Sequence, residues 1–147
     1  MGITSTTTAR AGREAGRAHS GKRARKNTML WAAQVLLAAV FAVAAMPKLA
    51  GAHSAVVMFG QIGAGQWLRY LVGTAELAGA IGLLIPRLAG LAAAGLAADM
   101  AGATIINIAV LHSAAVALTI PLCAALALIA RARREHTTKL PAARTGR

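Results

Sequence analysis

Four long apolar runs constrain the fold of this chain more than any other feature. A helix needs roughly 20 mostly apolar residues to cross the hydrocarbon core of a bilayer. The composition agrees, because 57% of the residues are hydrophobic, only 14% are charged, and the mean hydropathy is +0.60. The sequence therefore predicts an all-α integral membrane protein, a four-helix bundle. The predicted helices cover about residues 29–49, 68–85, 88–111 and 113–130.

The connections between the runs have different lengths. Pro86 and Arg87 form a tight turn between the second and third runs, because proline disfavours helix in the residue before it. His112 and its neighbours separate the third and fourth runs, which predicts an antiparallel hairpin. The loop from about Ala50 to Gln66 is the only long connection, and it contains no Lys, Arg, Asp or Glu. We expect it to be a mobile loop, with a lid or a partner surface as the alternative.

Basic residues predict the orientation in the membrane. The chain has 16 Lys and Arg against 4 Asp and Glu, and most of the basic residues lie in two tails, residues 1–27 and 131–147. Basic loops stay in the cytoplasm, so both termini and Arg87 are predicted to be cytoplasmic in a multi-pass protein of the inner (plasma) membrane. Both tails are polar and are expected to be disordered. They lack interleaved aromatic residues and nucleic-acid-binding motifs, which argues against a nucleic-acid partner.

The first apolar run has one alternative interpretation, a cleaved signal peptide, because a basic leader precedes it and small residues occur near its end. The run reaches spanning length, however, and its removal would leave three helices that conflict with the charge distribution. A membrane-spanning helix is the better prediction.

Small residues predict where the helices pack. Gly73, Gly79 and Gly82 share one side of the second run with Glu76, so another helix should lie against them. The third run has small residues at a spacing of four, which lets two backbones approach closely. These residues are Gly90, Ala94, Ala98 and Gly102.

Two acidic residues, Glu76 and Asp99, lie near the middle of apolar runs and are half of the four acids in the chain. At 1.5 Å per residue, Glu76 lies roughly 12 Å below the outer end of its helix and Asp99 roughly 16 Å above the inner end of its own. Charges at this depth are costly and are expected to face the bundle interior.

Lys48, Arg69 and Asn107 complete the candidate polar or ligand site. Lys48 either reaches Glu76 or Asn107, or extends to the headgroups. Two roles are open for Glu76 and Asp99: they form a structural hydrogen-bonded network, or they form a ligand or proton site.

The remaining chemistry-bearing residues point to no cofactor of the protein's own. Cys123 is the only cysteine, so the chain has no internal disulfide and no thiolate set for an iron–sulfur cluster. The histidines provide no facing pair for haem, and no ligand spacing suggests a metal site. They are His19, His53, His112 and His136.

Three segments resemble the DoxX-like family of small four-helix membrane proteins. They are MPKLAG at residues 46–51, GTAELAGAIGLLIP at 73–86 and ADMAGA at 98–103. The similarity covers about residues 30–130, and the surroundings of Lys48 and Glu76 match most closely. Pro47 precedes Lys48 where the family pattern has a small residue.

The resemblance implies a redox role. Members of the family are associated with quinone-linked oxidation of sulfur compounds and with complexes that respond to thiol or oxidative stress. The leading hypothesis is therefore a bacterial membrane subunit of a redox complex that binds a quinone or another small amphipathic ligand between its helices. Its expected partners are lipid, other subunits and further copies of itself. Alternatives are a scaffold or assembly factor without chemistry, and a proton-coupled carrier.

Overall fold

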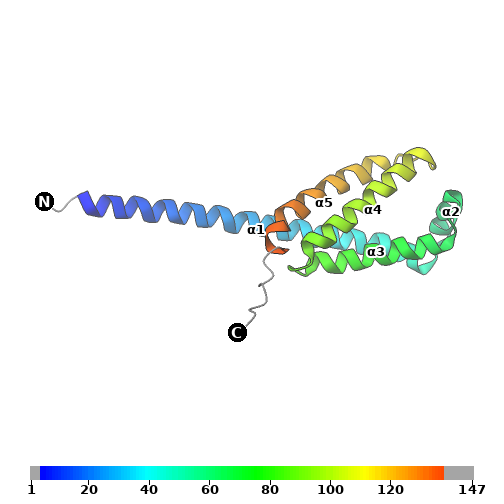
Figure 1. The fold of residues 1–147 in the computed structure, drawn as a ribbon, viewed down its shortest axis with the longest axis horizontal. Helices are drawn as coiled ribbons and strands as arrows, with labels where there is room; N and C mark the ends of the chain where they lie inside the picture. Colours follow the sequence, from blue (N-terminus) through cyan, green and yellow to red (C-terminus); the bar gives the residue numbers. More distant parts are fainter. Residues whose placement is uncertain (1–3, 138–147) are drawn as a thin grey trace, which may run out of the picture. The chain divides into compact units, whose positions relative to one another are not determined.

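The structure, a computed structural model, describes the backbone of residues 4–137 and the side chains of residues 25–134. The described residues form helices joined by short connections and contain no strand, so the all-α prediction is confirmed. The helices are α1 (Thr4–Ala50), α2 (His53–Ile62), α3 (Gln66–Leu84), α4 (Ala89–Ala109) and α5 (Val116–Thr137) (Figure 1).

The chain forms two compact units, residues 1–33 and residues 34–147, and α1 contributes to both. Residues 4–27 were expected to be a disordered tail, but their backbone is helical. Ala, Arg and Lys have high helix propensity, and no proline occurs in α1 before Pro47. At the other end, α5 extends through residues 131–137 of the second expected tail. The rest of that tail, 138–147, and residues 1–3 lie outside the described residues.

The described residues form five helices rather than four, because a helix occupies most of the predicted loop of residues 50–66. This helix, α2, buries Ala55 and Phe59, which lie one turn apart on one face. Glycines with positive φ bound it on both sides, Gly51 at 71° and Gly63 at 76°. With 10 residues, α2 is too short to cross a bilayer.

Three segments are long and apolar enough to cross a membrane: Arg25–Ala50, Ala89–Ala109 and Val116–Arg134. Most of each segment is exposed in the isolated chain, as expected for surfaces that face lipid. α3 is not among the three, and it carries Arg69 and Glu76, which lower its hydropathy. The chain is a multi-pass helical membrane protein whose apolar helices contact the bilayer.

Glycines of α3 mark its contacts with two other helices, as the sequence predicted. A Cβ atom on Gly73 would lie 3.1 Å from side-chain atoms of Lys48 and Leu49 at the end of α1. Farther along α3, a Cβ on Gly79 would lie 2.6 Å from the Leu96 side chain of α4. Gly82 is as close to α4, because its Cβ would lie 2.8 Å from Cβ of Ala92. Small side chains therefore allow α3 to pack against α1 and α4.

The predicted packing face of α4 is buried only at Gly90. Ala94 and Ala98 are exposed, and a Cβ on Gly102 would meet no atom within 4 Å. The helix instead buries a face that combines small residues with Leu96 and Met100, and Leu96 fills the space that Gly79 leaves open. The buried residues of α4 are Ala89, Gly90, Ala93, Leu96 and Met100.

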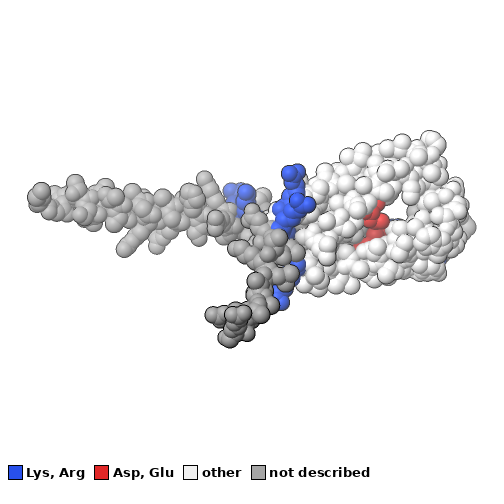
Figure 2. Space-filling view, viewed as in Figure 1, with Lys and Arg blue, Asp and Glu red and all other residues white. Residues whose placement is uncertain are grey.

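The two ends of the unit from residue 34 onward differ in charge. α2 and the turn between α4 and α5 lie at one end, and the turn between α3 and α4 lies at the other, near the end of α5 (Figure 1). Arg87, Arg131 and Arg134 are exposed, and blue side chains gather at this second end in Figure 2. There Arg133 is buried and its Nη2 donates a hydrogen bond to Oε1 of buried Gln34, at 2.8 Å. This contact ties α5 to α1.

Candidate functional site

An ion pair between Lys48 and Glu76 joins the last turn of α1 to the middle of α3. Lys48 Nζ lies 2.7 Å from Glu76 Oε2 and 2.9 Å from Oε1, and it also donates to the carbonyl of Ala44 at 3.1 Å. The side chains are 15% and 3% exposed. The sequence allowed Lys48 to reach Glu76, to reach Asn107 or to extend to the headgroups, and the structure contains the contact with Glu76. The absence of a side chain at Gly73 lets the two helices approach at this level.

Arg69 holds the end of α1 instead of pairing with an acid. Its Nη1 donates to the backbone carbonyl of Lys48, and its Nε donates to Oε1 of Gln66 at 2.9 Å. Gln66 in turn donates to the carbonyl of Val56 in α2 at 3.1 Å. The last carbonyls of a helix lack intrahelical donors, and a cation there is favourable for the helix dipole. Arg69 therefore caps α1 and fixes the backbone that carries Lys48.

Asp99 lies on α4 at the level of this ion pair. It is within electrostatic range of both Glu76 and Lys48. Its Oδ2 atom is buried and has no hydrogen-bond partner among the described residues. Buried carboxylate oxygens normally accept hydrogen bonds, so an oxygen without one calls for an explanation such as a ligand or a water molecule.

A cavity of about 380 Å³ connects these groups. Four of the five predicted site residues line it: Lys48, Glu76, Asp99 and Asn107. Arg69 does not. Figure 2 shows a hollow in one face of the molecule, with the red acidic side chains beside it. The remaining lining residues are apolar except for Thr119; they are Val40, Phe41, Ala44, Met58, Phe59, Ile62, Leu68, Val72, Met100, Gly102, Ala103, Ile106, Leu111, Leu118, Thr119 and Leu122.

All five helices contribute to the wall, and the face of α4 is the longest part of it. Asp99, Ala103, Ile106 and their neighbours recur at intervals of three and four residues, so they form one stripe along α4. From Asp99 to Asn107 this stripe extends roughly 12 Å along the helix axis. α2 lies in the segment for which a lid was the alternative prediction, and it covers the cavity with Met58, Phe59 and Ile62.

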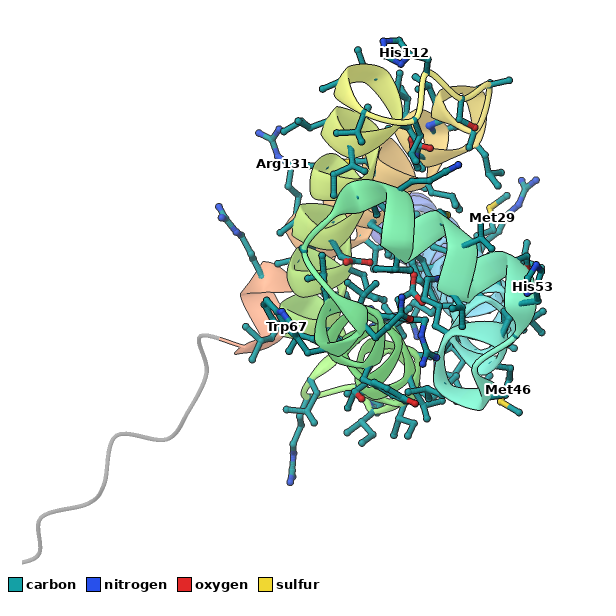
Figure 3. All side chains as sticks on the ribbon, turned by 90° about the vertical axis from the view of Figure 1, so that its right-hand side faces the viewer. Met29, Met46, His53, Trp67, His112 and Arg131 are labelled. Carbon is teal, nitrogen blue, oxygen red and sulfur yellow. The ribbon has the colours of Figure 1, made fainter. Side chains whose placement is uncertain are left out.

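The histidines do not assemble into a site in the described part of the chain. His53 and His112 are both exposed, and Figure 3 shows them well apart at the periphery. Among the described residues, no three His, Cys, Asp or Glu side chains are grouped so that they could hold a metal ion. His19 and His136 lie outside the side chains that the structure describes.

Several polar residues near the site were not predicted from the sequence. Gln66 links α2 to Arg69, and its position three residues before Arg69 on α3 is a signal that could have revealed their contact. Thr104 and Thr119 join α4 to α5 through a hydrogen bond of 2.8 Å between their hydroxyls. That contact follows from how the two helices are aligned, which spacing alone does not reveal.

The fold and the cavity together define a class: a multi-pass helical membrane protein with a polar cluster inside an otherwise apolar cavity. The sequence model of the DoxX-like family matches residues 32–130, and the chain belongs to this family. The match includes the parts of α1, α3 and α4 that carry Lys48, Glu76 and Asp99. Neither the curated proteins nor the solved structures contain a significant match.

Proposed function

We propose that this protein is a membrane subunit of a redox complex and that its cavity binds a quinone-like amphipathic ligand. The observation that carries the proposal is the combination of apolar walls with a few polar groups, the cluster of Lys48, Glu76 and Asp99 and, farther along α4, Asn107. Ligand pockets commonly have about 300–1,000 Å³, mostly apolar linings and a few polar groups that fix orientation. The cavity here, at about 380 Å³, has these properties.

The hollow beside the two acids supports entry from the bilayer (Figure 2). An apolar tail would lie along the residues of α4 and α5 that line the cavity, and the polar head would reach Asp99 and Asn107. Large apolar residues surround this face, including Leu118 at 63% and Ile105 at 65% exposure, and such surfaces favour lipid. A ligand that is dissolved in the membrane would reach the cavity without crossing water.

The redox role rests on the resemblance to DoxX-like proteins associated with quinone-linked sulfur oxidation. In this role the chain binds the ligand, and a partner subunit exchanges electrons with the bound ligand. Replacing Glu76 with Gln or Asp99 with Asn should lower quinone-linked oxidase activity of membranes, and Asp99→Asn, which breaks no ion pair or hydrogen bond of the described residues, should leave the complex assembled. Unchanged activity would reject the site, and loss of the partner without an effect on ligand binding would favour a scaffold.

We further propose that α1, α3, α4 and α5 each cross the bacterial inner membrane, with both termini in the cytoplasm. α3 carries two ionisable residues, but Arg69 and Glu76 are only 4% and 3% exposed, so both avoid lipid. The contact between Gln34 and Arg133 supports placing the cytoplasmic ends of α1 and α5 together. The exposed arginines at this end satisfy the positive-inside rule.

Two glycines of α4 provide a matched test of ligand binding. Gly102 lines the cavity and Gly95 does not, and a Cβ at either position would meet no atom within 4 Å. Gly102→Leu should fill the cavity without displacing neighbours, whereas Gly95→Leu adds the same side chain on the exposed surface. Binding of an alkyl-benzoquinone to protein in lipid nanodiscs should weaken at least about tenfold in the first variant only, which corresponds to about 1.4 kcal/mol. Equal binding by both variants and the unmodified protein would contradict the proposal.

A further inference from the structure

We infer that the cavity prefers head groups that donate hydrogen bonds, and so binds the hydroquinone form of its ligand more tightly than the quinone form. This inference rests on the proposed function and adds the chemical form of the ligand. It follows from a count of the donors and acceptors that the protein leaves available at the cavity wall.

The donors of the cluster are nearly all used within the protein. Lys48 has three N–H protons, and it has three acceptors: the carbonyl of Ala44 and the two carboxylate oxygens of Glu76. Thr104 donates to the carbonyl of Met100 at 2.7 Å. The Thr119 hydroxyl lies 2.8 Å from that of Thr104 and 3.4 Å from the carbonyl of Val116. Neither hydroxyl proton is left without a protein acceptor.

Asn107 supplies the one spare donor among these side chains. Its Nδ2 donates one proton to the carbonyl of Ala103 at 2.8 Å, which leaves the second N–H and the Oδ1 acceptor. A quinone head has two carbonyl oxygens that need donors, and this wall can serve only one of them directly.

Acceptors, in contrast, remain in excess. Asp99 Oδ2 is buried and has no partner among the described residues, and an ionised carboxylate can accept at both oxygens. Each Glu76 oxygen accepts one bond from Lys48 and retains a further lone pair. Lys48 is paired with Glu76, and the residues that line the cavity include no second Lys or Arg that could donate a hydrogen bond to Asp99. A hydroxyl group that donates to Asp99 would satisfy this oxygen.

The oxidised and reduced forms of one alkyl-benzoquinone differ little in shape, so their affinities isolate this preference. A hydrogen bond to a charged group contributes enough for an affinity ratio of about 10- to 100-fold in favour of the hydroquinone. The measurement is equilibrium binding to the full chain in nanodiscs under anaerobic conditions. The dimethyl ether of the same hydroquinone, which cannot donate, should bind as weakly as the quinone.

Asp99→Asn tests the residue assignment. Asp99 makes no hydrogen bond with the described part of the protein, so the substitution removes none, and the new amide offers a donor to a quinone carbonyl. The preference for hydroquinone should fall to within about threefold, on the order of a lost charged hydrogen bond. Thr74→Ala is the control, because Thr74 is exposed on α3 and does not line the cavity.

The outcomes separate the two proposals. Binding of both forms with equal affinity, or tighter binding of the quinone, would overturn this inference and leave the proposed function intact. Absence of binding by either form would overturn the proposed function. An unchanged preference in Asp99→Asn would overturn the role of Asp99.

Discussion

The two halves of the contact between α3 and α4 differ in how closely the helices approach. Near the turn that joins them, a Cβ on Gly79 would lie 2.6 Å from Leu96, and a Cβ on Gly82 would lie 2.8 Å from Ala92. Toward the other end, a Cβ on Gly102 would have no neighbour within 4 Å, and the cavity occupies the space. We call these the closed half and the open half.

The difference shows how a small bundle accommodates a polar cluster in its interior. In the closed half, glycines let the backbones of the two helices approach closely, and dispersion contacts between the helices stabilise this part. The open half gives up such contacts and holds Lys48, Glu76 and Asp99 instead. A cavity lowers stability because its lining lacks neighbours, so its presence beside the polar residues is an argument for function.

The largest expected effect comes from breaking the ion pair of the open half. Glu76→Gln removes the carboxylate that pairs with the ammonium of Lys48, whose side chain is 15% exposed, and leaves Asp99, which makes no hydrogen bond to Lys48, as the one acid lining the cavity. Removing one partner of a buried pair typically costs about 3–5 kcal/mol. Thermal denaturation in detergent should therefore show a large decrease in the midpoint.

The double variant Lys48→Met/Glu76→Leu is the control for this prediction. Replacing both charges by apolar residues leaves no unpaired group, so most of the lost stability should return. If the Glu76→Gln protein were as stable as the unmodified chain, the pair would contribute no stability and the polar cluster would be more hydrated than its burial indicates.

A smaller loss of stability is expected in the closed half. Gly82→Ala places a methyl group 2.8 Å from Cβ of Ala92, which is rigidly attached to the backbone of α4. The helices must move apart, at a cost of about 1–3 kcal/mol. Gly79→Ala should cost less, because its close contacts are side-chain atoms of Leu96, which can rotate. The same denaturation assay compares them, and a larger loss in Gly79→Ala would contradict this description of the contact.

The smallest effect should come from Gly102→Leu in the open half. The added side chain enters empty space, and Leu has a higher helix propensity than Gly, so stability should stay equal or rise by up to about 1 kcal/mol. Gly95→Leu should gain a similar amount from propensity alone. A marked destabilisation of Gly102→Leu would mean that the space is already filled by protein in solution.

Several parts of this arrangement could be predicted from the sequence. The depth of Glu76 and Asp99 in apolar runs indicated an interior polar cluster, since charged residues avoid lipid. The positions of Gly73, Gly79 and Gly82 predicted helix contacts, which the structure contains. These features depend on one helix at a time, and periodicity reveals them.

Features that depend on contacts between different helices could not be predicted. Arg69 is placed by its contact with the carbonyl of Lys48, 21 residues earlier, and no spacing rule signals that partner. α2 was missed because its segment is short and was interpreted as a connection. The packing face of α4 was misassigned because Ala and Gly occur on several sides of the helix, so small residues alone did not identify the buried one.

Photolabelling would test most directly whether the open half holds a ligand. An alkyl-benzoquinone with a photoreactive group on its tail is bound to the protein in nanodiscs and irradiated, and the labelled residues are mapped by mass spectrometry. We predict labels on cavity residues such as Met58, Met100 and Ile106, which excess unlabelled ligand prevents. Labels confined to exposed residues such as Leu91 and Leu128, without competition, would contradict the account.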